Sequence, residues 1–140
     1  MWILIIAPLR AYSSTLLYQA NNGGCFLCSS KDPATILWLM LHLSIGDTWN
    51  TINNVERRLG TAVSGIYAVL LSSLFASYKY YQVVPLAGKL LGLTCLWLAT
   101  ASVLVTQTWW LNPLPNGQRD KLYPVVGDVQ TRFVFESVPK

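Results

Sequence analysis

Residues 46–60 read GDTWNTINNVERRLG, and this polar stretch with apolar sequence on both sides decides the fold. It is either a loop between two helices or the end of a helix that carries polar side chains. Steps of three and four residues mark out one helical face, which holds His42, Gly46, Trp49, Asn50, Asn53 and Arg57. No Gly or Pro interrupts the chain between Asp47 and Leu59. The spacing therefore predicts a helix rather than a loop.

The composition is typical of a membrane protein. The chain has 140 residues, of which 53% are hydrophobic and 11% charged, whereas soluble domains carry about 25% charged residues. Seven of the sixteen charged side chains lie in residues 113–140, so residues 1–112 are more apolar still. The net charge of +4 is spread along the chain rather than gathered in a stripe, which argues against a nucleic-acid partner. We therefore expect an integral, multi-pass membrane protein in contact with lipid.

Four segments are long and apolar enough to cross a membrane, which takes about 20 residues. We predict an all-α bundle of four transmembrane helices over residues 2–19, 34–56, 59–77 and 85–111. Residues 1–112 would form the bundle, and residues 113–140 a polar tail outside the bilayer. With four spans, both termini would lie on the same side of the membrane. Lys and Arg are more frequent in the segments on that side, which predicts it to be cytosolic. Two locations remain open from the sequence: an organellar membrane, such as that of a plastid or mitochondrion, or a bacterial membrane.

The polar face of the second predicted helix has two readings. Polar side chains at membrane depth are costly unless they face the bundle interior or a wet cavity, so this face is expected to point inward. In the first reading, Asn50 and Asn53 hydrogen-bond neighbouring helices. In the second, His42, Trp49, Asn50 and Asn53 line a ligand cavity.

Other motifs give weaker signals. Cys25 and Cys28 form a C-x-x-C with no second pair and no nearby His, which favours two ordinary or redox-labile thiols over a metal site. For His42, the only histidine, a hydrogen-bonded position inside the bundle is favoured over a single axial haem ligand. The small-xxx-small pattern from Gly88 to Gly92 indicates close helix packing, within one bundle or across a homodimer. No arrangement typical of a hydrolase or a dehydrogenase is present, so an enzyme is not expected.

Two stretches carry a resemblance to a known family. Residues 41–50, LHLSIGDTWN, are followed by Arg58-Leu59-Gly60. The last predicted helix adds a spaced set of matching residues, Trp97, Ala101, Leu104, Trp109 and Asn112. Together they resemble the third and last helices of the TspO/MBR family, also called translocator proteins or tryptophan-rich sensory proteins. Gly46 and Val105 stand where that family usually has Asn, so the chain resembles a divergent member.

The resemblance implies a five-helix fold whose first helix would precede Met1, because residues 2–6 resemble part of the family's second helix. The family binds flat or bulky hydrophobic ligands within its bundle: porphyrins, and in animals cholesterol and synthetic drugs. We therefore expect a tetrapyrrole (porphyrin or haem) as the ligand, ahead of a sterol, and no required cofactor. Indole faces would stack on such a ligand and polar groups would hydrogen-bond it. The expected ligand-binding residues are His42, Trp49, Asn50, Asn53 and Trp97.

Two other functions stay open. A membrane scaffold or assembly factor would use the polar face only to hold helices together. A small-solute transporter is the third reading, although the sequence shows no inverted repeat and only Pro8 hints at a broken helix.

Overall fold

The computed structural model describes residues 2–20 and 34–123, and all regular structure in these two ranges is helical. The elements in chain order are the π-helical turn η1 (Trp2–Ile6), α1 (Ala7–Ala20), α2 (Thr35–Asn50), the π-helical segment η3 (Thr51–Glu56), α3 (Leu59–Val83) and α4 (Pro85–Leu111). The all-α fold class is confirmed. The Cys25 and Cys28 motif and the tail beyond Tyr123 lie outside the described residues.

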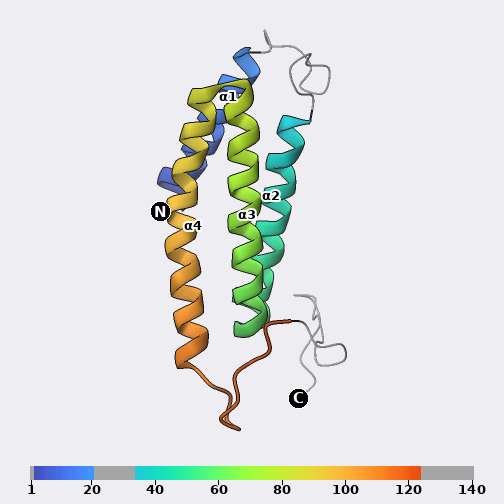
Figure 1. Ribbon diagram of the computed structural model, residues 1–140, viewed down its shortest axis with the longest axis vertical. Helices are drawn as coiled ribbons and strands as arrows, with labels where there is room; N and C mark the ends of the chain where they lie inside the picture. Colours follow the sequence, from blue (N-terminus) through green and yellow to red (C-terminus); the bar gives the residue numbers. More distant parts are fainter. Residues whose placement is uncertain (1, 21–33, 124–140) are drawn as a thin grey trace.

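The four helices form an up-and-down bundle in which α3 lies between α2 and α4 (Figure 1). α3 packs most extensively against α4 and next against α2. α1 packs mainly against α4 and lies alongside only one end of the other three helices, the end where α3 passes into α4 (Figure 1). There, Ser13 Oγ donates to the Ala87 carbonyl at 2.7 Å. Within the described residues, the other end of the bundle is therefore built from three helices.

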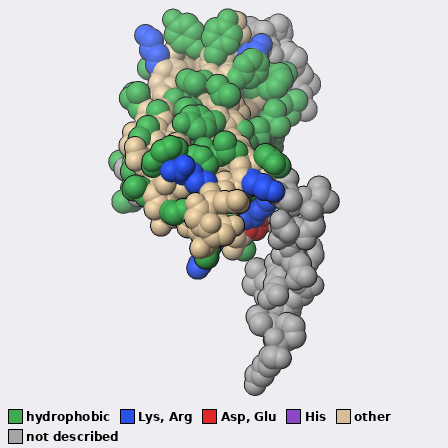
Figure 2. Space-filling model, turned by 60° about the horizontal axis from the view of Figure 1, so that its bottom comes forward, with side chains coloured by type: hydrophobic (Ala, Val, Ile, Leu, Met, Phe, Trp, Pro, Cys, Tyr) green, Lys and Arg blue, Asp and Glu red, His purple; other side chains and the backbone are tan. Residues whose placement is uncertain are grey.

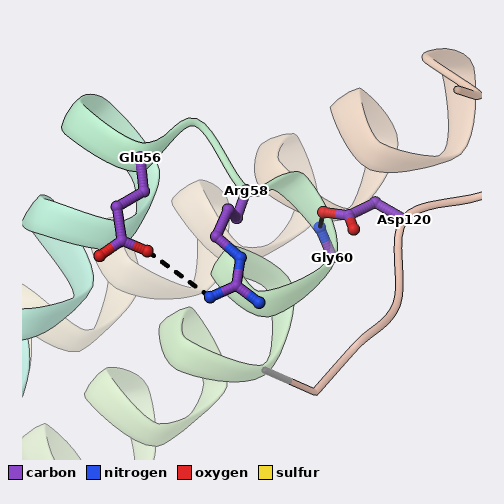
Figure 3. Close-up of polar contacts among 4 residues, drawn as sticks. All are labelled: Glu56, Arg58, Gly60 and Asp120. Atoms are coloured by element: carbon purple, nitrogen blue, oxygen red, sulfur yellow. Dashed lines mark hydrogen bonds and ion pairs between the residues drawn. The ribbon is translucent and has the colours of Figure 1, made fainter. Parts of the chain in front are cut away.

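The polar stretch at residues 46–60 is helical as far as Glu56, so the prediction of a helix is confirmed and the loop is excluded. Its last part, η3, is π-helical and so winds more widely than an α-helix. The helix ends at Arg57, which has a left-handed φ of 54° and donates its N–H to the Ile52 carbonyl. Such a left-handed residue is a common helix terminator. Arg58 then pairs with Glu56 across the end, at 3.6 Å (Figure 3).

The turn between α3 and α4 is tighter than the sequence predicts. The predicted third helix ends at residue 77, whereas α3 runs to Val83 and only Val84 separates it from α4. Tyr80, in the part of α3 beyond the predicted end, is fully buried in the bundle. Gly88 allows the close approach of the two helices, since a Cβ atom there would overlap the backbone of Tyr81.

The core is apolar, and so is much of the surface. One buried cluster joins all four helices and consists of Leu17, Leu39, Ala76, Tyr80, Ala87 and Leu91. On the outside, Leu71, Leu96 and Val103 are 66%, 68% and 59% exposed, and many apolar side chains lie on the face that Figure 2 shows. α3 and α4 are each long and apolar enough to cross a membrane. An apolar surface of this extent is typical of a protein that faces lipid or an apolar partner.

Residues 112–123, which we call the strap, fold back from the end of α4 to the beginning of α3 (Figure 1). The strap turns at Gly117, which has a φ of 75°. Asp120 Oδ2 then accepts a hydrogen bond from the Gly60 N–H at 2.8 Å (Figure 3). The Asp120 carbonyl accepts another from Trp109 Nε1, also at 2.8 Å, and Ser64 donates to the Leu122 carbonyl. The described part of the predicted tail is thus tied to the bundle.

Asp120→Ala is expected to lower the free energy of unfolding by about 1 kcal/mol, the usual cost of losing a helix cap. Arg58, which precedes the first turn of α3, makes no side-chain capping bond, so Asp120 takes this role from a distance. Asp120→Asn keeps an oxygen acceptor and should stay close to the parent protein. Thermal unfolding of the full chain in detergent measures both variants. No loss of stability in Asp120→Ala would contradict the capping role.

Candidate functional site

A chain of polar groups crosses the bundle at the level of His42. Arg10 Nη2 on α1 donates to His42 Nε2 at 2.9 Å. His42 Nδ1 lies 3.0 Å from Ser72 Oγ on α3, and this hydroxyl donates to the Val69 carbonyl at 2.9 Å. Because a hydroxyl has only one proton to donate, Ser72 accepts from His42. The network therefore assigns a neutral histidine with its proton on Nδ1.

His42 is 1% exposed, and hydrogen bonds engage both of its ring nitrogens. An axial haem ligand needs one nitrogen for the iron, so the geometry favours the hydrogen-bonded bundle histidine over the haem ligand. The contact also gives the half-buried Arg10 guanidinium a polar partner, which a charge removed from water needs. His42 holds the Arg10 guanidinium in place.

Trp49 is fixed against α3. Its Nε1 donates to the Ala62 carbonyl at 3.0 Å. Its ring lies against Gly65, where a Cβ atom would come within 2.9 Å of Trp49 Cδ1. Since the indole N–H is committed to α3, Trp49 can offer a ligand its apolar ring but no hydrogen bond.

A cleft of about 310 Å³, partly open to the surroundings, lies between these residues. It is lined by Arg10 of α1, by His42, Leu43, Gly46, Asp47, Trp49 and Asn50 of α2, by Val69 of α3 and by Leu98 of α4. Gly46 keeps the space open, because nothing lies within 4 Å of the position that a Cβ atom would take there. The volume is at the lower end of small-molecule sites, which span about 300–1,000 Å³.

The polar groups of the cleft differ in depth and charge. Arg10 is half-buried, whereas Asp47 and Asn50 are exposed. A carboxylate that enters the cleft can approach the Arg10 guanidinium, whose charge is partly offset by Asp47 of the same lining. The rest of the lining is largely apolar. This arrangement suits a hydrophobic molecule that carries a carboxylate, and nothing in it is arranged for proton transfer or nucleophilic attack.

Three of the five predicted ligand-binding residues line the cleft: His42, Trp49 and Asn50. The other two do not. Asn53 lies in η3, beyond the last lining residue of α2, and its Nδ2 donates to Asn54 Oδ1 at 3.0 Å. On α4 the cleft is lined by Leu98 instead of its neighbour Trp97, which is half-buried elsewhere.

Arg10 is one of several cleft residues that the sequence-based list misses, and it comes from a different helix than the listed ones. A signal for it exists, because Arg10 is the one charged residue in the first predicted span, residues 2–19. An ionisable side chain in that setting faces a polar partner and marks a functional-site candidate. The partner, His42, is 32 positions away in the sequence, and no local pattern indicates it.

The Gly88 and Gly92 pattern is used inside the bundle. Gly88 faces the Tyr81 backbone, and Ser77 Oγ donates to the Gly88 carbonyl at 2.8 Å. A Cβ atom at Gly92 would lie 3.1 Å from the same Ser77 Oγ. Of the two readings of this pattern, the contacts therefore support packing within one bundle.

Within residues 2–20 and 34–123, no group of His, Cys, Asp and Glu side chains could hold a metal ion. Comparison of the chain with family models, with characterised proteins and with solved structures gives no match. The resemblance to the TspO/MBR family therefore rests on the spaced residues of α2 and α4 themselves. Of these, Trp49 lines the cleft and Trp109 holds the strap.

Proposed function

We propose that the protein is a multi-pass membrane protein that binds a hydrophobic, carboxylate-bearing ligand in the cleft, with a tetrapyrrole as the ligand class. The observation that carries the proposal is an open space of about 310 Å³ with the Trp49 ring and the Arg10 guanidinium in its lining. The TspO/MBR resemblance supplies the ligand class. A porphyrin such as protoporphyrin is flat, stacks on an indole and carries carboxylates that need donors.

All four helices are proposed to cross the membrane. α3 and α4 have the length and hydropathy to do so. η1 and α1 contribute 5 and 14 consecutive residues, and α2 and η3 contribute 16 and 6. Each pair of consecutive segments is thus as long as a membrane span, which takes about 17–25 residues. The hydrogen bond between Arg10 and His42 supports this placement, because it lets α1 and α2 carry polar groups at membrane depth.

The test is a titration of the purified full chain in detergent with protoporphyrin, followed by tryptophan fluorescence. We expect saturable quenching. Gly46→Phe should fill the cleft, since its Cβ position is open, and should weaken binding at least about tenfold, or about 1.4 kcal/mol. Asn53→Ala, which lies further along the same helix and outside the cleft, should leave the titration unchanged. Unaltered binding to a folded Gly46→Phe variant would contradict the proposal.

The dimethyl ester of protoporphyrin is the matched control ligand. It keeps the flat ring but lacks the carboxylates, so it cannot form charge-assisted hydrogen bonds with Arg10. The free acid is expected to bind more tightly than the ester. Equal affinities would remove Arg10 from ligand recognition while leaving the cleft as the site.

A membrane scaffold or assembly factor is the competing function, and particular contacts favour it. His42 and Trp49 have their polar atoms committed to other helices, as a scaffold requires. A scaffold needs these contacts but not the space at Gly46. Saturable quenching that is lost in Gly46→Phe therefore separates ligand binding from a scaffold role. The transporter alternative is tested by counterflow of a labelled solute in liposomes.

A further inference from the structure

The end of the molecule where α4 stops carries a concentration of basic side chains. Arg57 and Arg58 precede α3, and Arg119 and Lys121 belong to the strap. Arg57, Arg119 and Lys121 are exposed. Figure 2, which brings this end forward, shows Lys and Arg side chains around it and little acidic surface.

Two acidic side chains lie at this end in the described part of the chain, and both are engaged within the protein. Glu56 Oε2 pairs with Arg58 Nη1 at 3.6 Å. Asp120 Oδ2 accepts from the Gly60 N–H at 2.8 Å, at the beginning of α3, where the helix dipole favours a negative charge (Figure 3). Both carboxylates therefore have partners other than the exposed Arg119 and Lys121. The outer surface of this end is cationic.

Arg119 is held on an aromatic surface. Its Cζ lies 3.5 Å from the centroid of the Trp110 ring and 5.7 Å from that of Trp109. A guanidinium stacked on a ring keeps its N–H groups in its own plane, where they can bind phosphate oxygens in pairs. Trp110 is 55% exposed at the end of a helix long enough to span a membrane, the position at which indoles meet lipid headgroups.

A shallow groove of about 270 Å³ lies beside this stack and is lined by Thr106, Gln107 and Trp110 of α4. The groove and the Arg119 stack share the Trp110 side chain. We propose that this corner binds an anionic phospholipid, with the phosphate on Arg119 and Lys121 and the glycerol and first acyl segment in the groove. The proposal rests on the membrane location proposed above but not on the cleft ligand.

The test is a lipid titration of the purified full chain in neutral detergent, with bound lipid counted by native mass spectrometry. Phosphatidylglycerol should be retained in preference to phosphatidylcholine, because only the first has a net negative charge. Arg119→Gln should weaken retention of phosphatidylglycerol at least about fivefold, the effect of one basic side chain at a membrane surface. Arg119→Lys keeps the charge but loses the planar stack. Its retention of phosphatidylglycerol should lie between that of the parent protein and that of Arg119→Gln.

Lys89→Gln is the matched control, since Lys89 is an exposed lysine near the beginning of α4, at the other end of the bundle. It should leave lipid retention unchanged. Equal retention of the two lipids, or a loss in Lys89→Gln as large as that in Arg119→Gln, would overturn the proposal. Displacement of the lipid by an equal concentration of glycerol phosphate would also overturn it, because the site would then recognise a free phosphate. No porphyrin is present in this titration, so it can fail while the cleft proposal stands.

Discussion

His42→Leu is expected to lower the free energy of unfolding by about 2–3 kcal/mol. Leucine fills a similar volume but removes the acceptor of Arg10 Nη2 and the donor to Ser72 Oγ. Most of the cost falls on Arg10, because a partly buried guanidinium that loses an acceptor keeps its charge and its desolvation. Unfolding of the full chain in detergent, by heat or by titration with a denaturing detergent, measures the loss.

The double variant Arg10→Met, His42→Leu distinguishes a lost hydrogen bond from lost packing. Removal of both partners replaces a polar pair by apolar side chains, a change that is often nearly neutral. We expect the double variant to be more stable than His42→Leu alone. If the losses of the two single variants simply add, the contact between Arg10 and His42 is not the source of the stability.

The positions of the helices follow largely from hydropathy and spacing, because long apolar runs with polar ends leave few alternatives. The ends of α4 coincide with the predicted bounds, residues 85–111. The end of α3 does not, and the extra turns carry the buried Tyr80, whose hydroxyl lies 3.3 Å from Ser14 Oγ on α1. The return of the strap depends on a contact between Gly60 and Asp120, which lie 60 positions apart. No local pattern contains such contacts.

The candidate site is predictable only as far as the α-helical period holds. The period brings His42, Trp49 and Asn50 together because all three lie in α2, whereas Asn53, in the π-helical η3, lies outside the cleft lining. A pattern that places a side chain on the inward face also does not tell whether that side chain lines a cleft or packs against a neighbouring helix. Gly46 illustrates the difference, because its missing side chain is what leaves the cleft open.

Gly88→Ala is expected to destabilise the bundle by about 3 kcal/mol although it adds a single methyl group. The added Cβ atom would overlap the Tyr81 backbone, which cannot rotate away as a side chain could. The helices cannot easily separate either, because only Val84 connects α3 to α4 and their contact is the most extensive in the protein. The loss should appear despite the better helix propensity of alanine, which is worth about 1 kcal/mol. Unfolding of the full chain in detergent measures it.

Gly46→Ala makes the same chemical change on α2 and serves as the matched control. Nothing lies within 4 Å of its Cβ position, so the variant should be as stable as the parent protein or up to about 1 kcal/mol more stable. The stability of Gly92→Ala should lie between those of Gly88→Ala and Gly46→Ala. Its Cβ atom would meet only the Ser77 hydroxyl, at 3.1 Å, and that side chain can rotate. A Gly88→Ala variant as stable as Gly46→Ala would contradict the close packing of α4 on α3, since the overlap with Tyr81 leaves no space for the methyl group.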